Sequence, residues 1–256
     1  MQAEPIHLPD TSATPPMGDG LRPDPSEKPP PPSRRNLSAA TLAYRQKYQS
    51  LVSARAYDTG YLQRRARTTL REMAIVRGFL RRYGDSLTIL DVPSGGGRLS
   101  ASLAEQASLI LEMDIARGQL LLGRENRLDT TPQDWIRASA LDIPLRDASV
   151  DGAVCIRLSH HLYSAQERER LLAELLRVAR RFVVFHYVDG NSPRYLLRRN
   201  KLAATPRRTN WMTYREVEAS ARRHGATVVA RVAARPLQPH QYALIEKPDA
   251  GPRSCR

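Results

Sequence analysis

The residues best suited to chemistry lie in a glycine-rich turn and in an acid that follows it. An apolar run from Leu87 to Leu90 leads into the stretch Leu90-Asp91-Val92-Pro93-Ser94-Gly95-Gly96-Gly97-Arg98. A strand, a tight Gly-rich turn and a helix start in this order are typical of units that hold nucleotide-like ligands against backbone N–H groups. Asp114 ends the next apolar run, 17 positions after Gly97, and a carboxylate near this spacing can bind both hydroxyls of a ribose. We therefore expect a nucleotide-like ligand here. The plainer alternatives are a structural turn and an acid that caps the next helix.

Histidines form the second set of candidates. His160 and His161 follow the apolar run from Val150 to Ile156, and His186 ends the apolar run that begins at Phe182. Histidine suits proton transfer near neutral pH, so we expect a general base among these three, with His161 and His186 preferred over His160. The alternative for each of them is a packing or hydrogen-bonding role.

Alternating elements must position these residues. Two helices are expected between 37 and 84, separated near Gly60. Residue spacing assigns the buried face of the first to Tyr44, Tyr48, Leu51 and Val52, and that of the second to Leu70, Met73, Val76 and Leu80. A helix and strand alternation follows. Capping-box spacings at Ser164 to Glu167 and Thr213 to Glu216 mark two later helix starts. Strands are expected at 87–92, 108–114, 135–140, 150–156, 182–186, 227–232 and 241–246, and a short helix is expected at 98–106. This alternation predicts an α/β fold with a mostly parallel sheet covered on both faces.

Taken together, these pieces resemble the class I S-adenosylmethionine-dependent methyltransferases of the type that includes small-molecule and quinone methylases. The segments that carry the resemblance are Leu90 to Gly97, Leu111 to Asp114, Ile143-Pro144-Leu145 through Asp151, and His160-His161-Leu162. It covers about residues 40 to 247. The resemblance implies a Rossmann-like, mostly parallel seven-stranded sheet with an antiparallel terminal hairpin. N-terminal helices, expected from residue spacing, and a disordered Pro-rich tail, expected from composition, precede it. It also implies S-adenosyl-L-methionine as the cofactor and methyl transfer as the activity.

The resemblance assigns cofactor contacts residue by residue. Asp91 and the backbone of Ser94, Gly95, Gly96 and Gly97 would meet the methionine part, Asp114 the ribose, and Ala140 and Leu141 the adenine, while Leu158 would close the pocket floor. Two positions depart from the family pattern. Pro93 stands at a usual glycine, and Ser139 stands at the usual acid that accepts a hydrogen bond from adenine. Since a serine carries no charge, weaker adenine binding is expected, with Asp142 as a nearby substitute. No metal ligands are expected.

The acceptor is less defined by the sequence. The segment from Asp189 to Trp211 is expected to face it and holds Arg194, Tyr195, Arg198, Arg199, Lys201, Arg207 and Arg208. Guanidinium groups match phosphate and carboxylate geometry, so an anionic small molecule or lipid head group is the first expectation. RNA is the second, and a solvated basic loop is the third. A non-catalytic basic interaction module is a further alternative, in which the Pro-rich tail recruits a partner and Pro93 and Ser139 impair cofactor binding. Arg64, Arg65, Arg67 and Arg71 are expected either at the mouth of the ligand site or on a solvated helix face.

Composition sets the remaining expectations. The chain has 256 residues and a formal net charge of +14, which suggests an anionic partner or an Arg-rich proteome. Residues 1–36 hold 10 of the 19 prolines and are expected to be disordered. The expected domain then covers 37–248, with N-terminal helices at 37–84, an α/β core at 85–248 and a flexible end at 249–256. With only two cysteines, no run long enough to span a bilayer and no signal or transit pattern, a cytoplasmic location is the default expectation.

Overall fold

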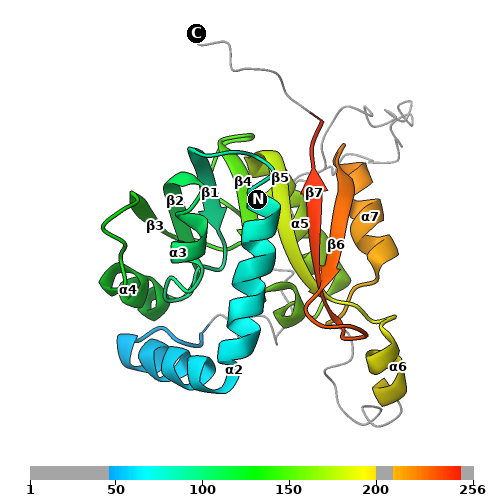
Figure 1. The fold of residues 1–256 in the computed structure, drawn as a ribbon, viewed down its shortest axis with the longest axis horizontal. Coiled ribbons are helices and arrows are strands. Elements are labelled where there is room, and N and C mark those ends of the chain that lie inside the picture. The colour runs from blue at the N-terminus through cyan, green and yellow to red at the C-terminus, as the bar shows by residue number, and fades with distance from the viewer. Residues whose placement is uncertain (1–45, 200–209, 249–256) are drawn as a thin grey trace, which may run out of the picture. The chain divides into compact units, whose positions relative to one another are not determined.

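The computed structural model of the chain describes residues 46–199 and 210–248. These residues form a seven-stranded sheet with helices on both faces (Figure 1). The predicted disordered tail at 1–36 and the predicted flexible end at 249–256 lie outside the described residues, so both stay predictions.

The sheet has the strand order β3-β2-β1-β4-β5-β7-β6. Strands β1 to β5 pair in parallel, and β7 runs antiparallel to both of its neighbours, β5 and β6. The strands are β1 Leu87–Asp91, β2 Ala107–Asp114, β3 Gln133–Arg137, β4 Val150–Cys155, β5 Ala179–Val188, β6 Thr227–Ala233 and β7 His240–Glu246. This confirms the predicted Rossmann-like sheet and its antiparallel terminal hairpin.

Both faces of the central strands are buried, which explains their nearly continuous apolar sequences. Successive residues of β5 alternate between two apolar clusters: Phe185 joins one face of the sheet and Phe182 joins the other. The first cluster includes residues of helices α5 (Ala165–Val178) and α7 (Tyr214–Arg223), and the second includes residues of α2 (Leu51–Leu80) and α3 (Ser100–Leu103). The other elements are α4 (Arg117–Glu125), the 3-10 helix η2 (Ser159–His161) and α6 (Pro193–Arg199).

Helix starts follow the sequence signals closely at two places. The side chains of Ser164 and Thr213 accept hydrogen bonds from the backbone N–H groups of Glu167 and Glu216, and both glutamates return a bond to the cap residue, so both capping boxes are confirmed. The helix predicted at 98–106 is wrong in extent, because only Ser100–Leu103 is helical. The Gly-rich turn, with φ of +81° at Gly97, continues up to this point and delays the helix.

The N-terminal helices were predicted less well. Leu51–Leu80 is one helix rather than two, although Figure 1 shows the ribbon changing direction between its blue first part and its cyan remainder. The predicted buried face is correct for Val76 and Leu80 but wrong for Val52 and Leu70, which are 80% and 64% exposed. Leu70 lies two positions before the fully buried Glu72, and residues two apart in a helix point to opposite sides. The helix is therefore oriented by a polar side chain as well as by its apolar ones.

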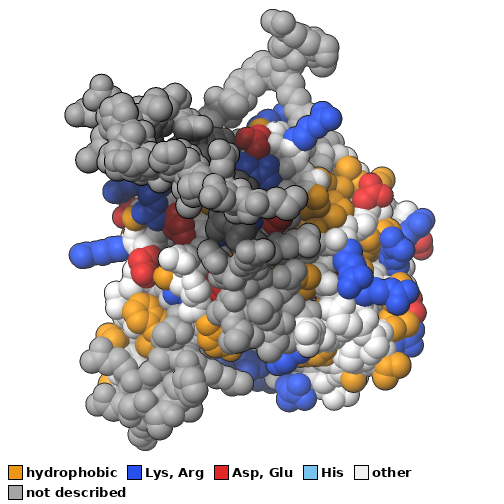
Figure 2. All heavy atoms as spheres, turned by 180° about the vertical axis from the view of Figure 1, so that it is seen from behind, with side chains coloured by type: hydrophobic (Ala, Val, Ile, Leu, Met, Phe, Trp, Pro, Cys, Tyr) orange, Lys and Arg blue, Asp and Glu red, His pale blue; other side chains and the backbone are white. Residues whose placement is uncertain are grey.

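Charged side chains are spread over the surface. On the face drawn in Figure 2, Lys and Arg side chains are interspersed with Asp and Glu. Within the described residues, no helix is long and apolar enough to cross a membrane.

Candidate active site

The turn after β1 places the backbone of a Gly-rich segment at the carboxyl end of the sheet. Gly95 and Gly97 have φ of +58° and +81°, a region that favours glycine. Gly96 is required for a different reason, because a Cβ at this position would lie 2.8 Å from Cδ2 of Leu122 in α4. The turn therefore packs closely against α4, and its backbone N–H groups can approach a ligand.

Asp114 ends β2 beside this turn. Its Oδ2 accepts a hydrogen bond from the backbone N–H of Gly95 (3.1 Å), and its Oδ1 accepts one from Ala116 (2.8 Å) just before α4. Burial raises the pKa of the Asp114 carboxyl, and these backbone donors partly offset that rise. The backbone N–H of Ile115 is a third donor to this carboxylate. Because a carboxylate has about four lone-pair sites, the side chain supports the turn and can still accept a further donor.

Asp91 and Ser94 carry buried polar atoms that lack partners among the described residues. These atoms are Oδ1 and Oδ2 of Asp91 and Oγ of Ser94. Burial, reinforced by the negative charge of Glu112, raises the pKa of Asp91 well above its usual range. Buried polar groups are normally satisfied, so an unpartnered carboxyl and hydroxyl at the same turn indicate a place where a polar ligand supplies the missing hydrogen bonds.

A cavity of about 350 Å³ joins the Gly-rich turn to the histidines. Its volume falls in the range of small-ligand pockets, roughly 300–1,000 Å³. The sequence-predicted site residues that line it are Ser94, Gly95, Gly96, Asp114, Ser139, Ala140, Leu141, Leu158, His160 and His161. Asp91, Gly97 and His186 do not line it, and Asp91 and His186 are almost completely buried. The cavity thus brings together most of the predicted cofactor residues and two of the three histidines.

The loop after β3 forms the side of the cavity predicted to hold adenine. Ser139 lines the cavity, and its Oγ accepts a hydrogen bond from the backbone N–H of Leu141 (3.3 Å). Asp142, the expected substitute for the missing acid, is exposed and does not line the cavity. The departure from the family pattern at Ser139 is therefore not compensated by Asp142.

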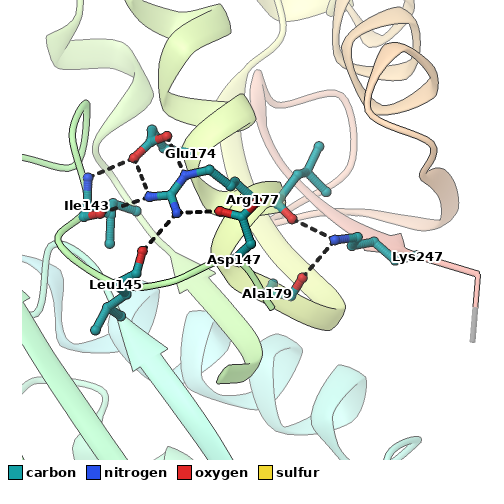
Figure 3. Close-up of polar contacts among 8 residues, drawn as sticks. Ile143, Leu145, Asp147, Glu174, Arg177, Ala179 and Lys247 are labelled. Atoms are coloured by element: carbon teal, nitrogen blue, oxygen red, sulfur yellow. Dashed lines mark hydrogen bonds and ion pairs between the residues drawn. The ribbon is translucent and has the colours of Figure 1, made fainter. Parts of the chain in front are cut away.

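Arg177 of α5 holds the rest of this loop in place (Figure 3). Its guanidinium donates to the carbonyl oxygens of Ile143 and Leu145, each at 2.8 Å, and to the carboxylate of Glu174. Glu174 in turn accepts a hydrogen bond from the backbone N–H of Ile143 (2.8 Å). Lys247 donates to two carbonyl oxygens at the end of α5, both at 3.1 Å. The contacts of Arg177 and Glu174 fix the loop to α5, and with it the side of the cavity predicted to hold adenine.

A wall of tyrosines, which the sequence analysis did not single out, comes from the N-terminal segment. Tyr48, Tyr57 and Tyr61 line the cavity. The ring centroids of Tyr48 and Tyr57 lie 4.4 Å apart, and those of Tyr57 and Tyr61 lie 5.8 Å apart. Arg64 and Arg65 also line the cavity. This confirms that two of the four arginines of α2 lie at the cavity, whereas no local sequence signal marked the tyrosines as its wall.

Glu72 joins α2 to three distant parts of the chain. Its carboxylate is fully buried and accepts hydrogen bonds from Nη1 of Arg98 (2.7 Å), Nε of Arg157 (2.7 Å) and the hydroxyl of Tyr242 (2.6 Å). Arg98 follows the Gly-rich turn, and Arg157 follows β4. Both guanidinium groups lie 5.3 Å from the ring centroid of Tyr61. The tyrosine wall is therefore fixed to the sheet through one carboxylate.

The histidines cluster at the ends of β4, β5 and β7. The ring centroid of His160 lies 4.1 Å from that of His161 and 5.7 Å from that of His186. His186 is fully buried, and its Nε2 lies 3.0 Å from Nδ1 of His240. Burial and the neighbouring imidazoles hold the pKa values of His160 and His186 well below their usual range. These rings are therefore neutral near pH 7. No group of side chains within 46–199 and 210–248 is arranged to hold a metal ion.

The segment predicted to face the acceptor is only partly described. Lys201, Arg207 and Arg208 lie outside the described residues, and the side chains of Arg198 and Arg199 are not described either. Asn210 Nδ2 donates to the backbone oxygen of His160 (2.6 Å), so the end of the segment lies next to the cavity. Its cationic residues remain a prediction as acceptor contacts.

Comparison with known proteins accounts for this arrangement. Residues 90–185 match the family model described as a methyltransferase domain. The chain contains a class I methyltransferase domain. Demethylmenaquinone methyltransferases of Clavibacter sepedonicus and Renibacterium salmoninarum are 33% and 32% identical to it over 90 and 92 residues, which are 35% and 36% of this chain. In each case the match spans 36% of the relative, so the chain spans about a third of the length of these curated relatives.

Solved structures agree with the methyltransferase domain in fold. A magnesium protoporphyrin IX methyltransferase from Synechocystis PCC 6803, solved with bound SAH, has a TM-score of 0.64 at 12% identity and is covered over 100% of its length by 82% of this chain. A possible histamine N-methyltransferase from Thermotoga maritima has a TM-score of 0.54 at 16% identity, with 76% of this chain and 96% of that chain covered. At these identities the likeness concerns the fold alone.

Proposed function

We propose that this chain is an S-adenosylmethionine-dependent methyltransferase that acts on an anionic small molecule. The observation that carries the proposal is the cavity that joins the Gly-rich turn and Asp114 to His160 and the tyrosine wall. S-adenosylmethionine, when bound, supplies a methyl group on a positively charged sulfur. The chain's own part is to hold donor and acceptor in line, which can supply much of the rate acceleration.

The cofactor side of the cavity is proposed to work through the backbone and two carboxyl groups. The methionine part would meet Ser94, which lines the cavity, and Asp91, which lies behind the lining at the end of β1. Asp114 would accept hydrogen bonds from the ribose hydroxyls. Ser139, Ala140 and Leu141 would flank the adenine, and Leu158 would close the cavity floor. Gly95, Gly96 and Gly97 would let the backbone approach the cofactor without a side chain in between.

The acceptor side of the cavity is both aromatic and cationic. Arg64 and Arg65 are exposed at the cavity, and neither lies within ion-pair distance of a carboxylate in the described part of the chain. Arg98 and Arg157 line it more deeply. Exposed cations without partners favour an anionic acceptor, a small molecule or a lipid head group. The curated relatives are named for demethylmenaquinone, which agrees with a small-molecule acceptor.

The other functions considered have less support. An RNA acceptor would need a basic track, and on the one face drawn in Figure 2 the visible side chains mix both signs of charge. A non-catalytic role would rest on Ser139 and Pro93, but Pro93 is accommodated in the turn and lines the cavity. Neither alternative explains the buried unpartnered atoms at the turn.

Calorimetric titration with S-adenosylmethionine and S-adenosylhomocysteine tests the proposal. The wild-type chain is expected to bind both, and Asp114→Ala is expected to weaken binding by roughly 10–100-fold, the value of a charge-assisted hydrogen bond. Asp129→Ala is the matched control, because Asp129 is exposed and does not line the cavity. Absence of binding in the wild type, without rescue by Ser139→Asp, would show that the chain does not use this cofactor.

A further inference from the structure

Three buried polar atoms on the acceptor side of the cavity lack hydrogen-bond partners within the described residues. They are the hydroxyl of Tyr61, Nη2 of Arg157 and Nδ1 of His160. They come from α2, from the loop after β4 and from η2, and all three residues line the same cavity. Since unpartnered buried polar atoms are rare in native proteins, three on one cavity wall point to a ligand that satisfies them together.

Arg157 is held so that one nitrogen remains available. Its Nε binds Glu72, and its guanidinium carbon lies 5.3 Å from the ring centroid of Tyr61. Its backbone has φ of +65°, and its N–H donates to Nδ1 of His186 (3.3 Å). The side chain of Ser159 also bonds the His186 backbone oxygen (2.9 Å). A guanidinium nitrogen can only donate, so Nη2 requires an acceptor, and an anionic oxygen gives the strongest bond.

The same contacts decide which histidine can accept a proton. Nδ1 of His186 accepts from Arg157, so in the neutral ring the proton is on Nε2, which faces Nδ1 of His240. Both nitrogens of His186 are therefore engaged, and the ring is fully buried. His160 lines the cavity and keeps Nδ1 unpartnered in the described structure. The sequence preferred His161 and His186 over His160; the geometry favours His160 over His186, and His161 lines the cavity as well.

We propose that Tyr61, Arg157 and His160 form the acceptor subsite, and that it takes a planar hydroxyaryl acid. Nη2 of Arg157 binds the acidic oxygen of the acceptor, Tyr61 contacts its ring and bonds it through the phenol, and Nδ1 of His160 faces the hydroxyl. When the hydroxyl oxygen bonds to the methyl carbon, its proton passes to Nδ1 of His160 and the electron pair of the broken carbon–sulfur bond stays on sulfur. The neighbouring Tyr57 and Tyr61 rings, tilted by 36° with centroids 5.8 Å apart, offer aromatic surface that favours a flat acceptor. This inference rests on the proposed function.

The experiment measures binding, not turnover, on the full chain. The protein is first saturated with S-adenosylhomocysteine, and this titration alone decides the proposed function. Two matched probe pairs follow: 2-hydroxybenzoate against 2-hydroxybenzamide, and 4-hydroxybenzoate against 4-hydroxybenzamide. At least one acid is expected to bind roughly 10-fold or more tightly than its amide, because only the acid offers a charged oxygen to Arg157.

Variants identify the residues that bind the acid and give the preference for it over the amide. Arg157→Lys keeps a positive charge for Glu72 but removes Nη2, so it should abolish the preference for the acid. Tyr61→Phe removes one hydroxyl and keeps the ring, and it should lower the affinity for the acid about 3–10-fold. His160→Gln should lower the affinity for the acid and for the amide by the same factor, because both probes carry the hydroxyl. Arg77→Lys and Tyr83→Phe are matched controls outside the cavity, with side chains bonded to Glu105 and Glu246, and should change nothing.

The results distinguish a wrong acceptor subsite from a wrong proposed function. Binding of S-adenosylhomocysteine without any preference for an acid, or a preference that survives Arg157→Lys, would overturn the subsite. If Arg157→Lys does not fold, Tyr61→Phe decides, and an unchanged affinity for the acid in that variant overturns the subsite as well. Failure to bind S-adenosylhomocysteine would instead refute the proposed function.

Discussion

The buried carboxylate of Glu72 gives the sharpest test of how α2 is held on the sheet. Glu72→Gln keeps the shape and one acceptor oxygen but removes the charge that faces Arg98 and Arg157. Those arginine side chains are only 16% and 14% exposed. Removing one partner from a buried ion pair costs about 3–5 kcal/mol, since the remaining charge stays desolvated. We expect a loss of this size in the free energy of unfolding, equivalent to roughly 6–20 °C in Tm for a domain of this length.

The assay is urea denaturation of the wild type, Glu72→Gln and a control variant, Glu105→Gln. Glu105→Gln is the matched control, because Glu105 pairs with Arg77 and Arg81 at the surface, where its side chain is 36% exposed. Exposed pairs contribute about 0–1 kcal/mol, so this variant should remain close to the wild type. Equal losses for Glu72→Gln and Glu105→Gln would refute the reasoning. The affinity of Glu72→Gln for the hydroxybenzoates should also fall, since Arg157 and Tyr61 lose their support.

Four further substitutions have defined expectations. Gly152→Ala should destabilise the chain by about 3 kcal/mol in urea denaturation, because its Cβ would lie 2.1 Å from Cζ of Phe182; Gly78→Ala, with open space around its Cβ, should stabilise it by about 0.5–1 kcal/mol. Ser139→Asp should tighten S-adenosylmethionine binding in calorimetry, and unchanged affinity would place the adenine amino group elsewhere. Burial lowers the pKa of His240 to about 4, so below pH 6.5 the unfolded state binds more protons than the folded state. Between pH 7.5 and pH 5 the free energy of unfolding of the wild type should therefore fall by about 2 kcal/mol more than that of His240→Gln.

The sequence predicted the sheet, and it predicted that the Gly-rich turn and Asp114 lie together, because these signals are local. A buried parallel strand is a short apolar run, and each such run of the α/β core became a strand. The two capping boxes specify helix starts within four residues of chain, at Ser164 to Glu167 and at Thr213 to Glu216. The Gly-rich turn and Asp114 lie within one strand–turn–helix unit and its neighbour. Short-range patterns of this kind do not depend on the rest of the fold.

The acceptor side could not be predicted in the same way, because its contacts link distant positions. Glu72 bonds to residues 26, 85 and 170 positions away along the chain. Helical periodicity assigned Leu70 to the buried face, whereas this polar network turned it outward. A glutamate between arginines in a helix looks like an ordinary solvated residue, and only the folded arrangement distinguishes it.

The Gly-rich turn and the tyrosine wall therefore differ in how readily their residues can be substituted. The family match at 90–185 contains the Gly-rich turn, Asp114 and His160, but it does not contain Tyr61 or Glu72. The cofactor side is held by the sheet itself, whereas the tyrosine wall is attached through Glu72 and its three partners. Substitutions on α2 can change the acceptor that fits while the backbone of the turn stays unchanged. On the proposed subsite, Arg157 and His160 lie inside the family match and Tyr61 and Glu72 lie outside it, so variants of α2 should separate acceptor affinity from cofactor affinity.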